Sequence, residues 1–179
     1  MQTLRLIATE KKVRLLEHLL SGEEEKIRVR AAAQAAGVSA GYVSLLVKRM
    51  EQDGLVEHGK LSSEDPRVHA LRMLFNADRL ARAWPKLRKA GVMGFGVFGS
   101  WARGTNGRNS DLDVWIKVRK DLGAADASRM RTLLKGETGV SEASLIILTP
   151  QRSGEIKNKD PLFYSTLLNS FIIGGEQVD

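Results

Sequence analysis

The chain has 179 residues, of which 42% are hydrophobic and 27% charged, and its formal net charge is +7. This composition is typical of a folded protein, and the length suffices for one ordinary domain or two small ones. The absence of cysteine excludes disulfides, thiolate metal sites and cysteine nucleophiles. His18, His58 and His69 lack the spacing of metal ligands, so a histidine zinc site is not expected.

No apolar run approaches the roughly 20 residues that a membrane span needs, and the first residues, MQTLRLIATEKK, lack the apolar core of a signal peptide. We therefore expect a soluble, cytoplasmic protein without a membrane partner. The positive charge is concentrated at residues 81–120, where nine basic residues accompany two acidic ones, Asp111 and Asp113. A basic surface suits a polyanionic partner or a triphosphate, although charge alone is equally compatible with a surface of no special purpose.

The first third of the chain predicts three helices. Apolar residues at helical intervals indicate a helix over 3–20, with Gly22 as its stop and the acidic run 23–25 as an exposed turn. An alanine-rich segment indicates a second helix over 28–37. A third helix follows to residue 52, with Ser39 as its N-cap, because a serine oxygen can accept a bond from an unpaired N–H of the first turn.

Three helices with a short glycine-containing turn between the second and third follow the helix-turn-helix pattern. After them, residues 55–58 and 68–73 are predicted as strands, joined by a polar wing over 59–66. Residues 1–76 therefore resemble a winged helix-turn-helix domain. The phrase MEQDGLVEHG (50–59) resembles the end of the recognition helix and the first wing strand of MarR-like regulators.

This resemblance implies that the third helix enters the major groove of duplex DNA. The candidates for base and phosphate contacts are Ser39, Gly41, Tyr42 and Ser44, with Lys48 and Arg49 reaching backbone phosphates. Because helix-turn-helix proteins usually meet two half-sites, a homodimer is the expected form. The alternative is a winged helix used only for protein contacts, since residues 1–80 carry a net charge of only +2.

Residues 77–90 are predicted to form a connecting helix, which Pro85 should kink or restart. The sequence has no Gly/Ser-rich linker near this point, so the two domains are expected to dock. The predicted division is a winged helix at 1–76, the connecting helix at 77–90 and a second domain at 91–179.

The second domain opens with an apolar run that ends at Gly99 and Ser100. We interpret this as a strand, a tight turn and the first turn of a helix, whose free N–H groups suit a phosphate. After a polar loop, SDLDVWI alternates as a strand, which places Asp111 and Asp113 on one face, about 6–7 Å apart. Two such carboxylates repel each other unless a cation lies between them, and Mg²⁺ suits their hard oxygen atoms.

The phrase FGSWARG…SDLDVWI (98–116) resembles the minimal nucleotidyltransferases of the DNA polymerase β-like superfamily. The resemblance implies that Gly99 and Ser100 contact the triphosphate of an incoming NTP and that Asp111 and Asp113 hold Mg²⁺. It extends to EASLIILTP (142–150), as a later strand, and to KDPLFYSTLLNSFIIGGE (159–176), as the C-terminal helix and final strand. The expected fold class is thus α+β, a winged helix-turn-helix followed by a nucleotidyltransferase fold with a mixed β-sheet flanked by helices.

One position departs from that family. The superfamily has a third carboxylate on the later strand, and this position falls on Ser144. Glu142 lies on the same strand face, one step displaced, where its longer side chain would reach the metal; the alternative is a solvated residue at the strand entrance. Two functions therefore stay open: NMP transfer from an NTP to a hydroxyl acceptor, and a DNA-binding transcriptional regulator whose second domain is a weak or inactive nucleotide sensor.

A competing motif is the sequence GFGVFG at 94–99, which matches the G-x-G-x-x-G of dinucleotide-binding folds. Those glycines should follow a strand, whereas here they lie within the strand-like run, so we do not expect a nicotinamide or flavin site. Trp101 and Trp115 are predicted to be packing residues.

Overall fold

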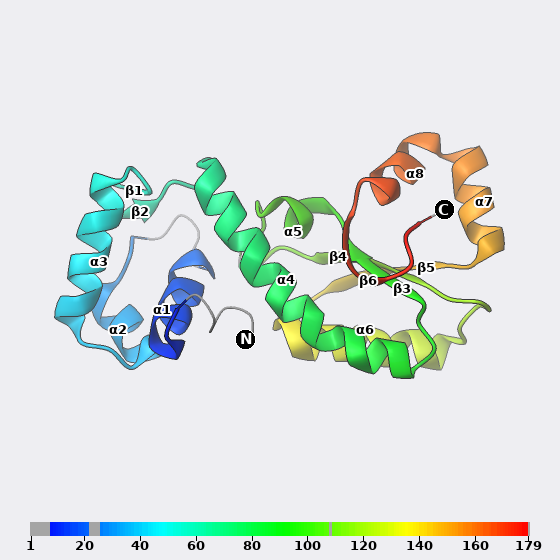
Figure 1. Cartoon of the computed structure of the whole chain (residues 1–179), viewed down its shortest axis with the longest axis horizontal. Coiled ribbons are helices and arrows are strands. Elements are labelled where there is room, and N and C mark those ends of the chain that lie inside the picture. Colours follow the sequence, from blue (N-terminus) through cyan, green and yellow to red (C-terminus); the bar gives the residue numbers. More distant parts are fainter. Residues whose placement is uncertain (1–7, 22–25, 108, 179) are drawn as a thin grey trace. The chain divides into compact units, whose positions relative to one another are not determined.

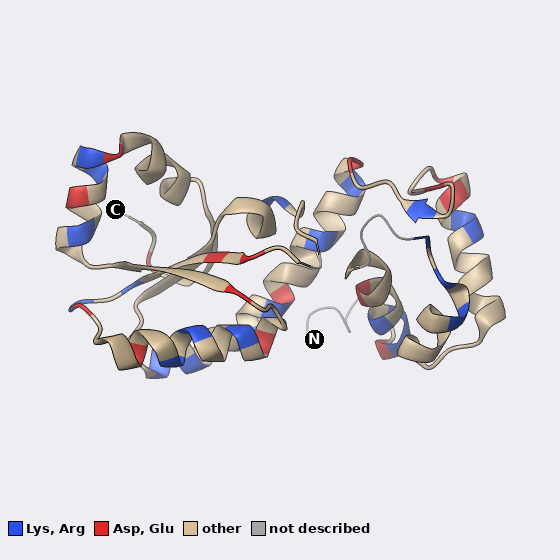
Figure 2. Cartoon of the chain, turned by 180° about the vertical axis from the view of Figure 1, so that it is seen from behind, with Lys and Arg blue, Asp and Glu red and all other residues tan. Residues whose placement is uncertain are grey.

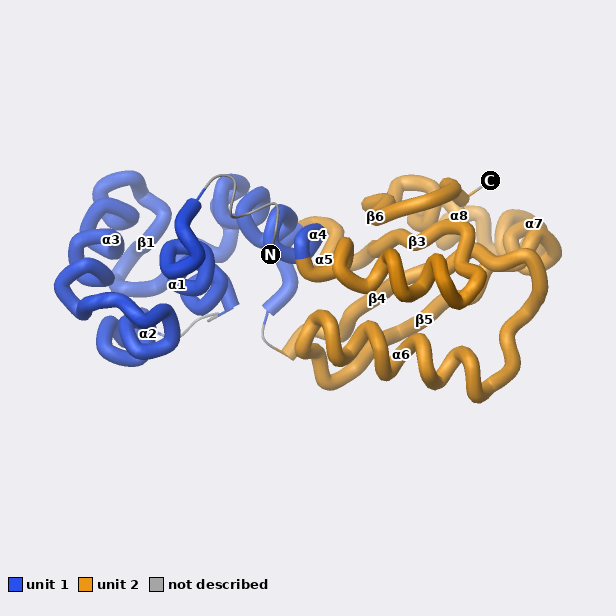
Figure 3. Tube along the Cα trace, turned by 60° about the horizontal axis from the view of Figure 1, so that its bottom comes forward, with its two compact units in different colours: residues 1–78, 104–108 blue, residues 79–103, 109–179 orange. Residues whose placement is uncertain are grey.

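The computed structural model describes residues 8–21, 26–107 and 109–178 (Figure 1). The chain divides into two compact units (Figure 3). Unit 1 contains residues 1–78 and 104–108, and unit 2 contains residues 79–103 and 109–179. Among the described residues, no helix combines the length and the apolar composition that crossing a membrane requires.

Unit 1 consists of helices packed beside a small hairpin. Its elements are α1 (Glu10–Ser21), α2 (Val29–Ala36), α3 (Ala40–Gln52), β1 (Val56–Glu57), β2 (Lys60–Leu61) and the first part of α4 (Pro66–Lys89). Strands β1 and β2 pair antiparallel, and Ile27 N donates to Gly59 O (2.8 Å) next to them. Buried apolar side chains from all of these elements form one core, which includes Val13, Leu15, Ala32, Val43, Val47, Val56, Val68 and Phe75.

The second and third predicted helices are confirmed as α2 and α3. Gly37 ends α2 in the left-handed conformation (φ 66°), which glycine adopts without steric cost. Ser39 caps α3 as expected, since its side chain accepts from Tyr42 N at 3.2 Å. The first helix begins at Glu10, later than predicted; residues 3–7, Gly22 and the acidic run 23–25 lie outside the described residues.

The strand predicted at 68–73 is wrong, because these residues belong to α4. Pro66 is the first helical residue, and Asp65 Oδ1 accepts from Arg67 N (2.7 Å), which together start a helix. The hydrogen-bonded Arg67 guanidinium also lowers the pKa of Asp65 to about 2, so Asp65 stays ionised at neutral pH and can accept the capping hydrogen bond. The strand that returns from β1 is instead β2, inside the segment predicted as the wing.

The helix predicted at 77–90 is the second part of α4, which begins at Pro66 and continues through Pro85 to Lys89 without a restart. The predicted boundary between Asn76 and Ala77 has no helix-breaking residue, and the division between the two units falls two residues later, after Asp78, within α4. The loop at 104–108 also belongs to unit 1. There Asn76 Nδ2 donates to Asn106 Oδ1 (2.7 Å), and Gly104 lies so close to the His69 backbone that a Cβ would collide with it.

Unit 2 contains, after the second part of α4, the elements β3 (Gly94–Val97), α5 (Gly99–Arg103), β4 (Leu112–Lys117), α6 (Ala124–Thr138), β5 (Ala143–Leu148), α7 (Pro150–Lys159), α8 (Pro161–Leu168) and β6 (Phe171–Gly175). Its strands form a mixed four-stranded sheet in the order β5-β4-β3-β6, in which β4 and β5 are parallel and the other pairs antiparallel. These strands confirm the predicted ones, whereas α6 and α7 had no counterpart in the prediction.

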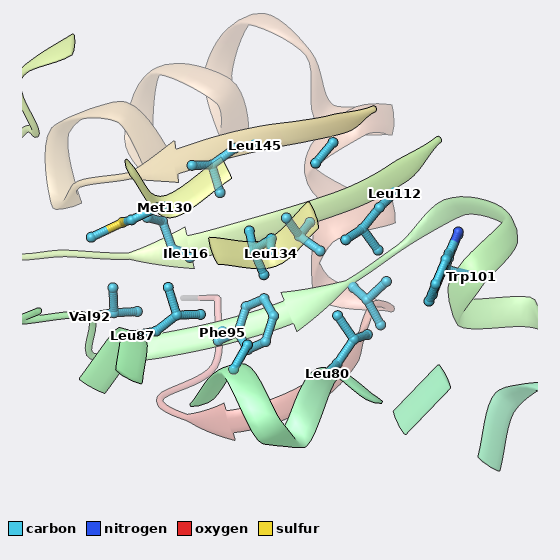
Figure 4. Packing of buried hydrophobic residues seen from close by; sticks show 14 of the residues in the cluster. Leu80, Leu87, Val92, Phe95, Trp101, Leu112, Ile116, Met130, Leu134 and Leu145 are labelled. Carbon is cyan, nitrogen blue, oxygen red and sulfur yellow. The ribbon is translucent and has the colours of Figure 1, made fainter. Parts of the chain in front are cut away.

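Apolar side chains pack on both faces of this sheet. On one face, Phe95, Leu112 and Leu145 of the sheet meet the second part of α4 and helix α6 (Figure 4). On the other face, Trp115 and Leu148 pack with Tyr164 and Leu167 of α8. Strand β4 is therefore held between two cores, which makes it a rigid support for the residues at its beginning.

Trp115 explains the glycines of β3. Its fully buried ring lies against Gly96, where a Cβ would stand 2.5 Å from ring atoms. Trp115 Nε1 donates to Ser170 Oγ (2.7 Å), which fixes the ring between β3 and the turn after α8. Trp101 is also buried, at 3% exposed, so both tryptophans pack as predicted. Gly96 thus makes room for the indole ring, and Gly94 makes room chiefly for the backbone of Glu176, which supports the interpretation that GFGVFG is not a dinucleotide site.

Gly96→Ala tests this packing. Because the new methyl group would force Trp115 from its position, we expect the free energy of unfolding to fall by about 1–3 kcal/mol, measured by urea titration. Gly136→Ala in α6 is the matched control, because its Cβ meets nothing within 4 Å and should cause no loss. Equal stability of the two variants would contradict the packing role of Gly96.

Candidate active site

The candidate site begins at the bend between β3 and α5. Gly99 has a φ of 68°, a left-handed conformation that favours glycine. Phe98 N donates to Asp113 O (3.0 Å), and Val97 pairs with Val114 in the antiparallel register. The carboxyl end of β3 therefore lies next to the beginning of β4, and the bend is joined to the strand that carries the acids.

Gly99 and Asp113 are in direct contact. A Cβ on Gly99 would lie 2.6 Å from Asp113 Oδ2, so only glycine fits at this position without displacing the carboxylate. Ser100 follows in the chain and is partly buried. The structure thus brings together the bend and the second acid of the predicted motif.

Asp111 and Asp113 differ in their surroundings. Asp111 is exposed and directly precedes β4, whereas Asp113 is partly buried on the strand. Leu112 and Val114, its neighbours along β4, are fully buried in the apolar core of the other face. Alternation along the strand therefore directs the Asp113 carboxylate away from that core, as predicted.

Burial raises the pKa of Asp113, and repulsion from Asp111 raises it further. A cation between the two carboxylates would relieve both effects. Carboxylate oxygens are the ligands of Mg²⁺, which binds through one or two carboxylates and completes its coordination with water and phosphate oxygens. Across the described ranges, no cluster of three or more His, Cys, Asp or Glu could hold a metal ion. The donor set of this site is therefore two acids, which fits Mg²⁺ bound together with a phosphate.

Ser144 occupies the position beside Asp113 on the neighbouring strand, since the two residues are partners in the parallel register of β4 and β5. Its side chain is exposed and carries no charge. Glu142 lies one step before β5, where its backbone O accepts from Leu112 N (3.1 Å). Its Oε1 is 3.5 Å from Lys135 Nζ of α6 in an exposed ion pair. The Glu142 carboxylate thus contacts a lysine, and the sheet position beside Asp113 holds only a hydroxyl.

The predicted DNA-binding residues lie in unit 1, on α3 or at its N-cap. Ser39, Gly41, Ser44, Lys48 and Arg49 are exposed, and Tyr42 is partly buried against the core of unit 1. Ser44 and Lys48 are one helical turn apart, so they share a face of α3. The α3 ribbon is mostly tan, with the colours of charged residues only toward its end (Figure 2), where the sequence has Lys48, Arg49 and Glu51. The helix therefore presents small polar groups in its first half and two cations in its second.

Asp113→Asn tests the electrostatics of the site. A carboxyl whose pKa is raised by folding lowers stability once it ionises, so the cost is present above the raised pKa and vanishes below the unfolded pKa. In metal-free buffer at pH 7 we expect the variant to melt at a higher temperature than the wild type, by calorimetry. The gain should shrink as the pH falls through the raised pKa of Asp113 and should be lost below about 4, near the ordinary pKa of aspartate.

Asp121→Asn, an exposed change in the same unit, is the control and should bring no comparable gain. Mg²⁺ should raise the melting temperature of the wild type more than that of Asp113→Asn. If the wild type is more stable than Asp113→Asn at pH 7 without metal, the proposed cost of burying an ionised Asp113 beside Asp111 is contradicted.

Comparison with known families gives one match. The model of a family described as the nucleotidyltransferase domain matches residues 77–170, and no curated protein or solved structure gives a significant match. The matched segment covers more than half of the chain and runs from the middle of α4 to the turn after α8. It includes the bend at Gly99, both acids and Ser144, and it leaves out α1 to α3. The chain therefore belongs to the nucleotidyltransferase domain family.

Proposed function

We propose that this protein is a Mg²⁺-dependent nucleotidyltransferase that transfers NMP from an NTP to a hydroxyl group of an acceptor. Membership of the nucleotidyltransferase family supports an NTP as substrate. The observation that carries the proposal is the contact between Gly99 and the carboxylate of Asp113, with Asp111 two residues before it. A triphosphate on the bend would then lie beside both acids.

In this proposal, each part of the site has one task. The bend holds the β- and γ-phosphates, because Gly99 lets the backbone approach and Ser100 adds a hydroxyl donor. Asp111 and Asp113 hold Mg²⁺, which when bound neutralises charge on the phosphate oxygens and aligns the reacting groups. The acceptor hydroxyl oxygen bonds to the α-phosphorus while pyrophosphate leaves. The buried neighbours Leu112 and Val114 and the Phe98–Asp113 hydrogen bond keep bend and acids in register before substrate arrives.

We also propose that residues 1–76 form a winged helix-turn-helix domain that binds duplex DNA as a homodimer in the cytoplasm. Supporting observations are the order of α1, α2, α3 and the β1–β2 hairpin, together with the cap at Ser39. In this interpretation, the first half of α3 reads base edges and Lys48 and Arg49 contact phosphates. The hairpin then serves as the wing.

A second candidate function is favoured by Ser144. A hydroxyl beside Asp113 cannot supply the charge or basicity of a third carboxylate, which weakens the activation of an acceptor while leaving nucleotide binding in place. With a DNA-binding domain in the same chain, this describes a transcriptional regulator whose nucleotidyltransferase domain senses nucleotide. In either case, Glu142 joins the metal only if it leaves Lys135.

Transfer is tested with α-³²P-labelled NTPs, Mg²⁺ and hydroxyl acceptors that include RNA 3′ ends and the protein itself. We expect labelled acceptor with the wild type and none with Asp111→Asn/Asp113→Asn. Ser144→Asp should raise the rate by at least about tenfold by restoring a base beside Asp113, whereas the isosteric but neutral Ser144→Asn should not. A metal-dependent gain in thermal stability with NTP, but no transfer by the wild type or Ser144→Asp, would contradict the enzyme and favour the sensor.

DNA binding is tested by measuring duplex affinity at several salt concentrations. If Lys48 and Arg49 each neutralise one phosphate, Lys48→Gln/Arg49→Gln should lower affinity and reduce the slope of log K against log salt by about 1.8. The matched control is Lys11→Gln/Lys12→Gln, which removes the same charge from the exposed surface of α1. Equal losses for the two double variants, or no salt-dependent binding, would overturn the role of α3 and leave a domain used for protein contacts.

A further inference from the structure

Unit 2 contains a basic cavity at the end of the sheet opposite the candidate active site. The cavity has a volume of about 520 Å³ and lies where the parallel strands β4 and β5 end and α7 begins. Its lining includes Arg119 and Lys120, after β4, and Arg152, in the first turn of α7. Three cations from two segments of the chain thus share one hollow.

These cations have no partners within the part of the chain that the structure describes. None of the Arg119, Lys120 and Arg152 side chains forms a hydrogen bond or an ion pair there. The two acids of the lining are engaged with neutral groups instead: Asp121 Oδ1 accepts from Leu122 N (2.9 Å), and Glu155 Oε1 accepts from Gln151 Nε2 (3.1 Å). The lining thus carries three cations and two carboxylates, a net charge of +1, and an anion placed among the three cations would relieve their mutual repulsion.

The helix end contributes little to this charge. Pro150 has no N–H, and Thr149 Oγ1 already accepts from Arg152 N (3.1 Å). A bound anion would therefore be held by the three side chains, chiefly by the two guanidinium groups, whose planar donors match phosphate oxygens.

A second, smaller hollow adjoins the cavity. It has a volume of about 180 Å³, shares Asp121 and Arg152 with the cavity, and is bounded by the apolar residues 145–147 of β5. Strand β5 is at the edge of the sheet. A ligand with its anionic group among the cations would thus lay an organic part against this apolar strand.

We propose that this cavity binds an organic phosphate ester in a site separate from the candidate active site. Arg119 is six residue steps from Asp113, about 20 Å for extended chain, and the first four of these steps lie in β4. A nucleotide-sized ligand in the cavity cannot reach the aspartates, so it acts as an effector or anchors a larger substrate, not as the NTP that reacts. The site depends only on residues of unit 2 and not on whether transfer occurs.

The experiment is calorimetric titration of the full chain with 5′-AMP, inorganic phosphate or adenosine, in EDTA, so that no metal-dependent site contributes. The background is Asp111→Asn/Asp113→Asn, which separates this site from the proposed active site. We expect 5′-AMP to bind more tightly than inorganic phosphate and adenosine not to bind. Arg119→Gln/Arg152→Gln should lower the affinity for 5′-AMP by at least about tenfold, because two charge-assisted contacts are lost.

Lys89→Gln/Arg131→Gln is the matched control, because it removes two exposed cations of unit 2 that do not line the cavity, and it should retain affinity within about twofold. If the two double variants lose affinity equally, binding reflects net charge and the site is overturned. Equal affinity for 5′-AMP and phosphate would overturn the role of β5.

If Arg119→Gln/Arg152→Gln unfolds, the single variants Lys120→Gln and Arg152→Lys replace it, and each should also weaken the binding of 5′-AMP. Failure of 5′-AMP to bind, together with NTP transfer by the wild type, would leave the proposed function standing, and 5′-AMP binding without transfer by the wild type would leave this site standing.

Discussion

The contact between the Asp113 carboxylate and Gly99 is the constraint on which the site depends. It exists because β3 and β4 pair antiparallel with Val97 opposite Val114, which brings the end of one strand to the beginning of the other. Asp113 is also partly buried and only two residues from Asp111, so burial and then repulsion from that second acid raise its pKa. The proximity of the two acids is unfavourable, so the rest of the sheet has to stabilise it, and the burial of Leu112 and Val114 provides that stabilisation.

Strand β4 changes character along its length. On the face of Asp113, the next residue is Trp115, whose buried ring lies on Gly96 and bonds to Ser170. The charged end of this face therefore stands directly beside its most tightly packed part. This packing holds β3 and β4 together next to the bend, and the proposed phosphoryl transfer would rely on such preorganisation.

The sequence was sufficient for the features that depend on neighbours in the chain. The bend at Gly99, the direction of Asp113 away from the apolar core and the cap at Ser39 follow from spacing and residue type. The strand prediction at 68–73 was wrong because the apolar residues of VHALRM fit the repeat of a strand and the repeat of a helix alike. Only the buried residues of the longer segment, among them Val68, Phe75 and Leu80, show that it is a helix. The sequence did not predict the basic cavity, because Arg119 and Arg152 are brought together only by the parallel pairing of β4 and β5.

In the proposed function, Ser144 determines how the binding of metal depends on the binding of nucleotide. A third carboxylate beside Asp113 would attract a cation by itself, but it would add repulsion to an acid whose pKa is already raised. With serine there, two carboxylates balance the charge of one Mg²⁺ and leave most of its coordination to other oxygens. The triphosphate is the natural source of those oxygens. In the proposed function, metal and nucleotide therefore bind as one complex, and an acceptor has to bring its own basic group or accept slow transfer.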